Sequence, residues 1–258
     1  MSYFPQVSSG SIAQFPLRRL RKWRSIENRL ESNESIAMPD PSAGEIEWNF
    51  SMKDLSDPEA HSITDLFSLA NGQFGAFLFV DPLANLLGWS ENLSRPDWQA
   101  GLLNVITGAA DPIGSQRASL LVNPSAGTQA LQQTVALPGE YVACFSAWVS
   151  SDVSSWVTLA RGTKEVTVPV GPVWKRVYIT GKGERGATES AFSMLLDAGQ
   201  SINVWGMQVE AQPYPSEYKQ TRSAMGIYDQ TYFANDELTM TITGVGLSSC
   251  EIALKSRV

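Results

Sequence analysis

The sequence of 258 residues has very little cysteine and histidine, and both shortages exclude classes of function. Its two cysteines, Cys144 and Cys250, exclude a disulfide framework. We expect two buried free thiols, with a single bridge between modules as the alternative. The one histidine, His61, would have to serve any Ser-His-Asp triad, Cys-His pair or histidine-rich metal site, and no nucleophile motif surrounds it. We therefore predict a protein that is not an enzyme and that needs neither a cofactor nor a Cys/His metal centre.

The chain also lacks an apolar run near the ~20 residues that a membrane-spanning helix needs. Its first residues do not have the charged-then-apolar order of a signal peptide, so we expect synthesis in a cytoplasm and no membrane insertion. Basic residues are few, because the formal net charge is −7 and the sequence pI is 4.8. Such a balance argues against nucleic acid as the main partner, since phosphate neutralisation needs clustered Lys and Arg.

One basic cluster does exist, at residues 18–24. It holds Arg18, Arg19, Arg21, Lys22 and Arg24 around an apolar leucine and tryptophan. Three glutamates follow it within ten residues and would offset its field. We interpret the cluster as a strand whose charges meet an acidic neighbouring surface, and contact with DNA or RNA is the alternative.

Alternation of polar and apolar residues predicts a mainly β protein with one α-helix. Residues 45–52 alternate over eight positions and predict a strand, after a predicted turn at residues 38–44. The sequence Ser56-Asp57-Pro58-Glu59 is typical of a helix start, and Asn71-Gly72 of a helix end. Residues 74–80 predict a strand buried on both faces, and two alternating runs near the C-terminus, 238–243 and 250–255, predict a hairpin.

The middle of the chain predicts an all-β sandwich with turns at regular spacing. The segment 202–218, INVWGMQVEAQPYPSEY, predicts its last strand, with a bulge at Gly206 and an end at two prolines. The other strands are predicted at residues 119–122, 129–136, 141–149, 155–160, 165–170, 175–180 and 192–196.

Two phrases bracket this region. The first, NLLGWS, runs from Asn85 to Ser90, and the second, VWGMQVE, runs from Val204 to Glu210 and is followed by Tyr218. The pair resembles the opening and closing phrases of the jelly-roll, carbohydrate-binding-type modules that are common in phage tail proteins. The resemblance implies an inserted jelly-roll β-sandwich over residues 86–218 that binds a host surface glycan.

The flanking segments carry a second resemblance. They contain RSIENRL at 24–30, EWNF at 47–50, Pro58-Glu59 at the helix start and GAFLF at 75–79 before Asp81-Pro82. This order resembles the belt domain of siphophage distal tail proteins and the minor tail protein M family of lambda-like phages. It implies a belt-type β-sandwich with one α-helix, formed by residues 1–85 and 219–258 around the inserted module, because a surface loop tolerates a folded insertion whose ends are close. A tandem arrangement of three pieces is the alternative.

The second resemblance implies a structural phage virion protein. The expected role is a distal tail or tail-tip ring, by resemblance a hexamer, that links the tail tube to the baseplate and contacts tail tube and tail hub proteins. The protein would be assembled in the host cytoplasm and located in the phage tail. From the residues, we expect the basic strand 18–24 to face an acidic surface of the next subunit. A non-catalytic carbohydrate-binding adhesion module outside any ring is the alternative.

Sugar binding requires an exposed aromatic ring that stacks on a pyranose, with polar side chains at its hydroxyls. Trp156 follows the polar loop 150–155 and is the predicted platform. We predict that Trp148 and Trp205 lie in the core and that Trp89 and Trp98 pin the module to the belt domain. The remaining predicted carbohydrate-binding residues are Trp174, Tyr178, Arg161 and Arg176.

Carboxylates leave two alternatives open. A calcium site with oxygen ligands would draw on Asp97, Asp111, Asp197 and Glu210, whereas scattered surface acids, with no metal bound, are the expectation. Two carboxylates arranged for glycoside hydrolysis remain an alternative to simple binding, because their separation is a spatial property.

Overall fold

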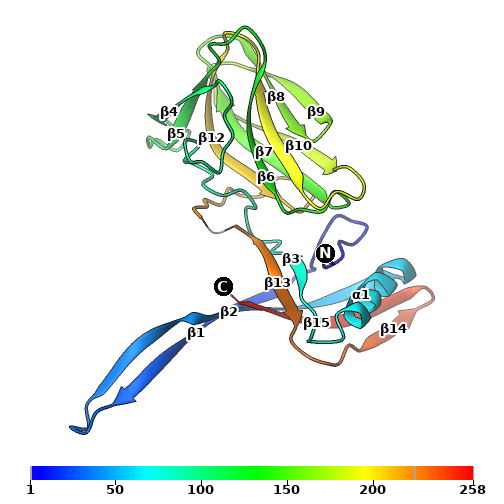
Figure 1. Ribbon diagram of the computed structural model, residues 1–258. Coiled ribbons are helices and arrows are strands. Elements are labelled where there is room, and N and C mark those ends of the chain that lie inside the picture. The colour runs from blue at the N-terminus through cyan, green and yellow to red at the C-terminus, as the bar shows by residue number, and fades with distance from the viewer. Residues whose placement is uncertain (1, 224, 258) are drawn as a thin grey trace. The chain divides into compact units, whose positions relative to one another are not determined.

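The computed structural model describes residues 2–223 and 225–257 and confirms a mainly β protein with one helix (Figure 1). The chain divides into two compact units. Unit 1 contains Met1–Phe79 and Tyr228–Val258, and unit 2 contains Val80–Ile227. The sequence placed the domain boundaries at 85/86 and 218/219, and separate folding of the two units stays a prediction. No helix among the described residues is long and apolar enough to cross a bilayer.

Unit 1 is built on a six-stranded sheet with the strand order β1-β2-β15-β13-β3, and β14 pairs with β15 (Figure 1). Its strands are β1 (Leu17–Arg29), β2 (Ser35–Ser56), β3 (Phe77–Val80), β13 (Ile227–Phe233), β14 (Met240–Gly244) and β15 (Leu247–Arg257). The C-terminal hairpin is confirmed. It lies inside the sheet, because β15 pairs with β2 from Leu247↔Ser56 to Arg257↔Glu45.

The neighbour of β3 is β13, a strand that the alternation pattern did not reveal. The C-terminal hairpin is therefore not the direct neighbour of β3, because β13 lies between β15 and β3. Phe74 also lies outside the strand and is 86% exposed, whereas Phe77 to Val80 are buried as predicted.

Aromatic side chains fill the core of unit 1. The ring of Phe79 lies 4.9 Å from that of Trp48 and 5.7 Å from that of Phe4. Helix α1 (Asp57–Leu69) buries Ile63 and Leu66 and ends at the predicted Asn71-Gly72, both with positive φ. Ile63 and Leu66 are apolar and lie at helical spacing, so the helix covers the core with one face.

The start of α1 is fixed by Glu59. Its carboxylate accepts hydrogen bonds from the Ser56 N–H at 2.8 Å and the Ser56 hydroxyl at 2.6 Å, as well as from the Ser8 N–H at 2.7 Å. Partial burial raises the pKa of Glu59, but these hydrogen bonds outweigh burial and lower the pKa to about 2. The carboxylate therefore joins the N-terminal loop to the helix start.

The β1–β2 hairpin extends as a two-stranded ribbon beyond the part of β2 that pairs with β15 (Figure 1). The predicted turn at 38–44 is wrong, because these residues lie inside β2. Pro39 pairs with Ser25 in the two-stranded part, where one edge of β2 has no neighbour among the described strands. A proline that faces such an edge removes no ladder hydrogen bond, so the strand continues.

Two basic residues of β1 meet acids of their own hairpin. Lys22 pairs with Glu45 at 3.6 Å and with Glu47, and Arg24 Nε donates to Asp40 Oδ2 at 2.9 Å. Arg18, Arg19 and Arg21 are exposed along the same strand. Part of the basic cluster is thus neutralised within unit 1, and its contact with another subunit stays a prediction.

Unit 2 is a jelly-roll β-sandwich of two sheets (Figure 1). The five-stranded sheet has the order β10-β7-β12-β5-β4, and the four-stranded sheet has the order β6-β11-β8-β9. All the strands predicted for this region are present, and only β4 had been missed. The strands are β4 (Asn104–Ala109), β5 (Ala118–Val122), β6 (Gln129–Val135), β7 (Val142–Ser150), β8 (Ser155–Arg161), β9 (Lys164–Val170), β10 (Lys175–Lys182), β11 (Ser190–Leu196) and β12 (Ser201–Glu210).

The chain enters and leaves unit 2 at neighbouring positions. The N–H of Asp81 donates to the Gly226 carbonyl at 2.8 Å. Asn85 is buried, and its amide group donates to the Met207 and Lys219 carbonyls at 3.0 Å each. The two bracketing phrases of the sequence therefore meet in space. Both cysteines are buried free thiols, Cys250 in unit 1 and Cys144 in unit 2.

Candidate functional site

The predicted sugar-binding residues lie on two different surfaces of unit 2. Trp156 is 54% exposed on β8, and its neighbour Val157 is buried between the sheets, so Trp156 belongs to the outer face of the four-stranded sheet. Trp174 precedes β10, where Arg176 and Tyr178 alternate with the buried Val177 on the outer face of the five-stranded sheet. The predicted residues therefore do not form one site.

Arg161 does not fit a sugar contact. Its side chain is inside the protein, with 3% of the residue exposed. The guanidinium donates to the Tyr141 carbonyl at 2.8 Å, to the Ser190 hydroxyl at 3.1 Å, and to the Gly181 carbonyl. Burial lowers its pKa to about 10. Arg161 thus joins the segment before β7, the end of β10 and the start of β11, and its role is structural.

The outer face of the five-stranded sheet carries a row of large side chains, of which only Arg176 had been predicted to bind sugar. Trp148 on β7 pairs with Arg176 on β10 and with Trp205 on β12. The ring of Tyr218 lies 4.7 Å from the Trp205 ring at an interplanar angle of 59°. We call the groove of about 470 Å³ that these residues line the aromatic groove. Its other lining residues are Glu91, Ile113, Arg117, Glu217 and Gln220.

The prediction that Trp148 lies in the core is wrong. Ala147 and Val149 are fully buried between the sheets, so Trp148 must point to the opposite face of its strand. Trp205 is 6% exposed, because Tyr218 covers it. The alternation along β7 shows that Trp148 lies on the opposite face from Ala147 and Val149. It does not show which of the two faces is open to solvent.

Glycine is required in the bulge of β12. Gly206 has φ +64°, and a Cβ at this position would lie 3.4 Å from both the Trp148 and the Tyr218 side chains. The register between β12 and β7 shifts between Trp205 and Gln208, as the predicted bulge implied. The bulge therefore lets the two aromatic side chains close over the backbone of β12.

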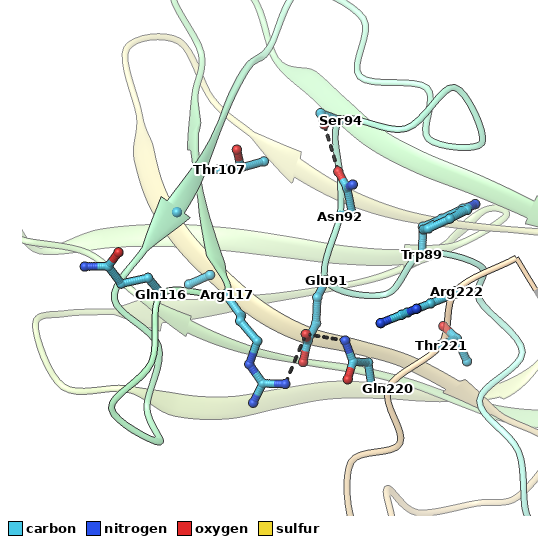
Figure 2. Close-up of a pocket in the computed structure, with 12 residues that line it drawn as sticks. Trp89, Glu91, Asn92, Ser94, Thr107, Gln116, Arg117, Gln220, Thr221 and Arg222 are labelled. Carbon is cyan, nitrogen blue, oxygen red and sulfur yellow. Dashed lines mark hydrogen bonds and ion pairs between the residues drawn. The ribbon is translucent and has the colours of Figure 1, made fainter.

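A second cavity of about 420 Å³ adjoins the aromatic groove and shares Glu91, Arg117 and Gln220 with it (Figure 2). We call it the polar cavity. Its other lining residues are Trp89, Asn92, Ser94, Thr107, Gly108, Gln116, Ala118, Thr221 and Arg222. Figure 2 shows Glu91 between Arg117 and Gln220, with both of them bonded to its carboxylate.

The Glu91 carboxylate is the buried charge of the site. Its side chain is 8% exposed, and Oε2 accepts from Arg117 Nη1 at 3.3 Å and from Gln220 Nε2 at 2.8 Å. Burial raises the pKa of Glu91, and the charge of Arg117 and the side chains of Tyr218 and Trp205 lower it by less. The site thus keeps a carboxylate at the boundary between aromatic and polar walls.

Asp111 positions Arg117. Its carboxylate accepts hydrogen bonds from the N–H groups of Ile113 at 3.1 Å, Ser115 at 2.9 Å and Arg117 at 3.2 Å, and also from the Ser115 hydroxyl. Burial raises the pKa of Asp111, but these donors outweigh it and the net pKa is lowered. The side chain of Asp111 therefore holds the 111–117 loop, which connects β4 to β5.

Glu210 and Ser90 position the segment that carries Tyr218 and Gln220. Glu210 is buried and accepts from the Ser216 N–H and from Lys219 Nζ, both at 2.9 Å. The Ser90 hydroxyl lies 2.8 Å from the Tyr218 hydroxyl and accepts from the Thr221 N–H at 2.9 Å. The closing phrase of the sequence thus forms one wall of the site.

Trp89 forms part of the polar cavity in a strained backbone conformation, with φ +50°. Its N–H donates to the Arg222 carbonyl at 2.9 Å, and its own carbonyl accepts from Trp98 Nε1 at 3.2 Å. The guanidinium of Arg95 lies 4.3 Å from the centre of its ring. These contacts of Trp89 and Trp98 lie within unit 2, and they fix an aromatic side chain at the cavity.

In the part of the chain that the structure describes, the site offers binding groups and no recognisable catalytic constellation. The single histidine, His61, is exposed in α1, where its Nδ1 lies 2.7 Å from the Asp57 carbonyl. Among the described residues, no group of three or more Asp, Glu, His or Cys side chains is placed to hold a metal ion. Of the acids considered for calcium, Asp111 and Glu210 are occupied by the internal hydrogen bonds given above.

No family model matches the chain, and no curated protein matches its sequence. Solved structures with similar folds include three with TM-scores between 0.37 and 0.41. Tailspike protein 4 of bacteriophage CBA120 has a TM-score of 0.40 and 14% identity over 51% of this chain and 22% of the tailspike. The family 22 carbohydrate-binding module of Clostridium thermocellum Xyn10B has a TM-score of 0.41 and 17% identity over 50% of this chain and 96% of the module. TmCBM61, solved with β-1,4-galactotriose, has a TM-score of 0.37 and 15% identity over 48% of this chain and 97% of TmCBM61. The matches cover about half of this chain, and at these TM-scores they do not establish its family or function.

Proposed function

We propose that unit 2 is a non-catalytic carbohydrate-binding module that binds a polysaccharide in the aromatic groove and the adjoining polar cavity. The observation that carries this proposal is the row of Trp148, Trp205 and Tyr218 beside the amide of Gln220 and the guanidinium of Arg117. Aromatic faces stack on the apolar face of a pyranose, and fixed polar groups accept or donate hydrogen bonds at its hydroxyls. The combined volume of the two cavities suits a short stretch of sugar chain.

A paired substitution tests the position of the site. Calorimetry or affinity electrophoresis with a panel of soluble polysaccharides first finds a ligand for the full chain. Trp148→Ala should then weaken binding by about tenfold or more, since loss of a central aromatic contact typically exceeds ~1.4 kcal/mol. Trp156→Ala is the matched control, because that ring is on the outer face of the other sheet.

Two results would count against this placement. Loss of binding in Trp156→Ala with full binding in Trp148→Ala would move the site to the platform predicted from the sequence. Absence of binding to every polysaccharide by the unsubstituted chain would remove the glycan proposal. Thermal melting of each variant separates loss of binding from loss of fold.

We further propose that unit 1 assembles with copies of itself as a structural component of a phage tail tip. The supporting observation is the end of the β1–β2 ribbon, where Ile26, Ile36 and Met38 share one face and are 43%, 48% and 47% exposed. A two-stranded ribbon is marginally stable alone in water, so an apolar face on it favours cover by another protein surface. The sequence resemblance adds the ring, its hexameric state, and the tail tube and hub partners.

Light scattering at increasing protein concentration tests self-assembly. We expect Ile26→Glu with Met38→Glu to yield monomers, because two like charges that lie opposite each other on that face would be buried in an assembly without pairing with each other. The matched control is Ser25→Glu with Ala37→Glu, on the opposite face of the same ribbon. Monomers of the unsubstituted chain at high concentration, or assemblies that survive the Ile26/Met38 change, would contradict the proposal.

A further inference from the structure

The surroundings of Glu91 combine burial with an unusual set of neighbours. Oε2 accepts from Arg117 and Gln220, and the Trp205 indole and Tyr218 hydroxyl lie close enough to stabilise its negative charge. Glu91 Oε1 and Trp205 Nε1 are both hidden from solvent, and neither makes a hydrogen bond of normal geometry. Every one of these neighbours presents a donor, so the position suits a group that only accepts, which is an ionised carboxylate.

These neighbours come from segments that are far apart in the sequence. Arg117 ends the 111–117 loop, Trp205 lies on β12, and Tyr218 and Gln220 belong to the closing segment of unit 2. Glu91 itself follows the opening phrase NLLGWS. One carboxylate therefore joins the aromatic wall of the groove to the polar wall of the cavity (Figure 2).

We propose that Glu91 is a positioning residue which holds these two walls together only while it is ionised, so that acidification releases the polysaccharide from unit 2. This inference rests on the proposed glycan-binding function. A protonated Glu91 would lose its charge pair with Arg117 and present an O–H to neighbours that are themselves donors. Arg117 and Gln220 would then lose their common acceptor, and their placement beside the aromatic groove would no longer be fixed.

The electrostatics around Glu91 favour its protonated form more than those around a free glutamate. Burial raises its pKa above the ordinary value of 4.5, and the nearby charge of Asp111 raises it further. Arg117 opposes this increase. The other charged side chains that line the two cavities are Arg176, Glu217 and Arg222.

Asp111 does not titrate with Glu91. Its donors lower the pKa of Asp111 below the ordinary value, so it stays ionised while Glu91 takes up a proton. Glu210 is likewise held ionised, because its hydrogen bonds with Ser216 and Lys219 outweigh burial and lower its pKa. Of Glu91, Asp111 and Glu210, Glu91 is therefore the one that takes up a proton first as pH falls.

Protonation of Glu91 affects ligand binding and folding stability in opposite directions, so loss of binding in acid can be told apart from acid unfolding. A carboxyl whose pKa is higher in the folded chain than in the unfolded chain binds its proton more tightly when folded. Its contribution favours the folded state at low pH and is lost as pH rises through the raised pKa. Protonation of Glu91 therefore should weaken binding without itself lowering the melting temperature of unit 2.

The test measures polysaccharide binding between pH 8 and pH 4, with the ligand found for the full chain. Below the pKa of Glu91, we expect affinity to fall by about tenfold per pH unit, as for a single required ionisation. Glu91→Gln should bind at least about tenfold more weakly at pH 8, with a flattened pH profile, because its amide N–H group faces donors. Glu91→Asp keeps the charge and should keep the pH slope at reduced affinity. Glu165→Gln, exposed on β9 in the other sheet, is the control and should leave the profile unchanged.

Tryptophan fluorescence of the free protein gives a readout that needs no ligand. Trp205 lies beside Glu91, so the emission should change with one protonation in the unsubstituted chain and not in Glu91→Gln. A polysaccharide that binds with no pH dependence, or equally well to Glu91→Gln, would overturn the inference and leave the binding module intact. If no polysaccharide binds, the proposed function fails. If the fluorescence of Glu91→Gln changes with pH just as that of the unsubstituted chain does, the positioning role is rejected as well.

Discussion

The β1–β2 ribbon of unit 1 and the site of unit 2 both combine charged and apolar side chains, but they place their charges differently. In the β1–β2 hairpin, Lys22 is 47% exposed and pairs with glutamates on the neighbouring strand at the surface. In unit 2, Glu91 and Glu210 have side chains that are 8% and 1% exposed. Glu91 bonds to Arg117 and Gln220 from separate segments, and Glu210 holds the segment that contains Ser216 and Lys219. Exposed pairs contribute little, whereas a buried carboxylate without its partners is strongly unfavourable.

The comparison indicates where each unit tolerates change. The ribbon obtains its geometry from strand pairing, so its side chains are free to meet another surface. The walls of the site obtain their geometry from a few acids, so single substitutions there should disturb several segments together. The predictions below probe this difference, from the largest expected effect to the smallest.

Removal of β15 should have the largest effect, because this strand joins β2 to β13. A chain that ends before Leu247 should lose the melting transition of unit 1. Residues 80–227 expressed alone should still melt cooperatively, since the acids that hold the site all lie within unit 2. Calorimetry of both proteins checks this. A fragment 80–227 without cooperative melting would show that unit 2 depends on unit 1.

The Asp111→Ala substitution sharpens the comparison inside unit 2. It removes the acceptor of three backbone N–H groups, and we expect a loss of about 1–3 kcal/mol in the free energy of unfolding. Glycan binding should weaken as well, because Arg117 loses its support. Chemical denaturation measures the first effect and calorimetry the second. Asp152→Asn, an exposed acid, is the control.

Acid should weaken unit 1 through Glu59. Its pKa is lowered to about 2 in the folded chain from 4.5, so its contribution to stability is present above pH 4.5 and is lost as pH falls toward 2. Glu59→Ala should remove that part of the pH dependence and destabilise unit 1 by about 1 kcal/mol at neutral pH, as for loss of a helix cap. Circular dichroism melts across this pH range test it. An unchanged acid profile in Glu59→Ala would reject the role.

The smallest effect is expected at the surface of the β1–β2 hairpin. Lys22→Met removes two exposed ion pairs, and the melting temperature should not change measurably, because exposed pairs contribute little. If this substitution lowered the melting temperature as much as Asp111→Ala, the distinction between the ribbon and the site would be wrong.

Much of the secondary structure could be predicted from local patterns. The capping residues of α1, the bulge at Gly206 and most strands of unit 2 all depend on neighbours within a few positions. The turn expected at 38–44 failed, because whether a proline ends a strand depends on a free edge, which is a property of the sheet. Strand β13 was missed because its burial is set by the strands beside it.

The site was harder to predict than the fold. Arg161 and Trp156 were both predicted to bind sugar, and only Arg161 is buried, because the segment 138–141 and the end of β10 close over it. Trp148 and Glu91 were not chosen, since the groove depends on which sheet face the closing segment covers. Alternation shows which residues share a face of a strand, whereas tertiary packing decides which face is buried.

The hydrogen bond between Asp81 and Gly226 also bears on the order of folding. Strands β3 and β13 are neighbours in the sheet of unit 1, although the whole of unit 2 separates them in the sequence. In an unfolded chain, their pairing would have to close a very long loop, with the entropy loss that such a loop carries. Once unit 2 has folded, its two ends are adjacent and the same pairing closes little more than a short connection. Unit 2 should therefore fold first and act as the turn that brings β3 and β13 together.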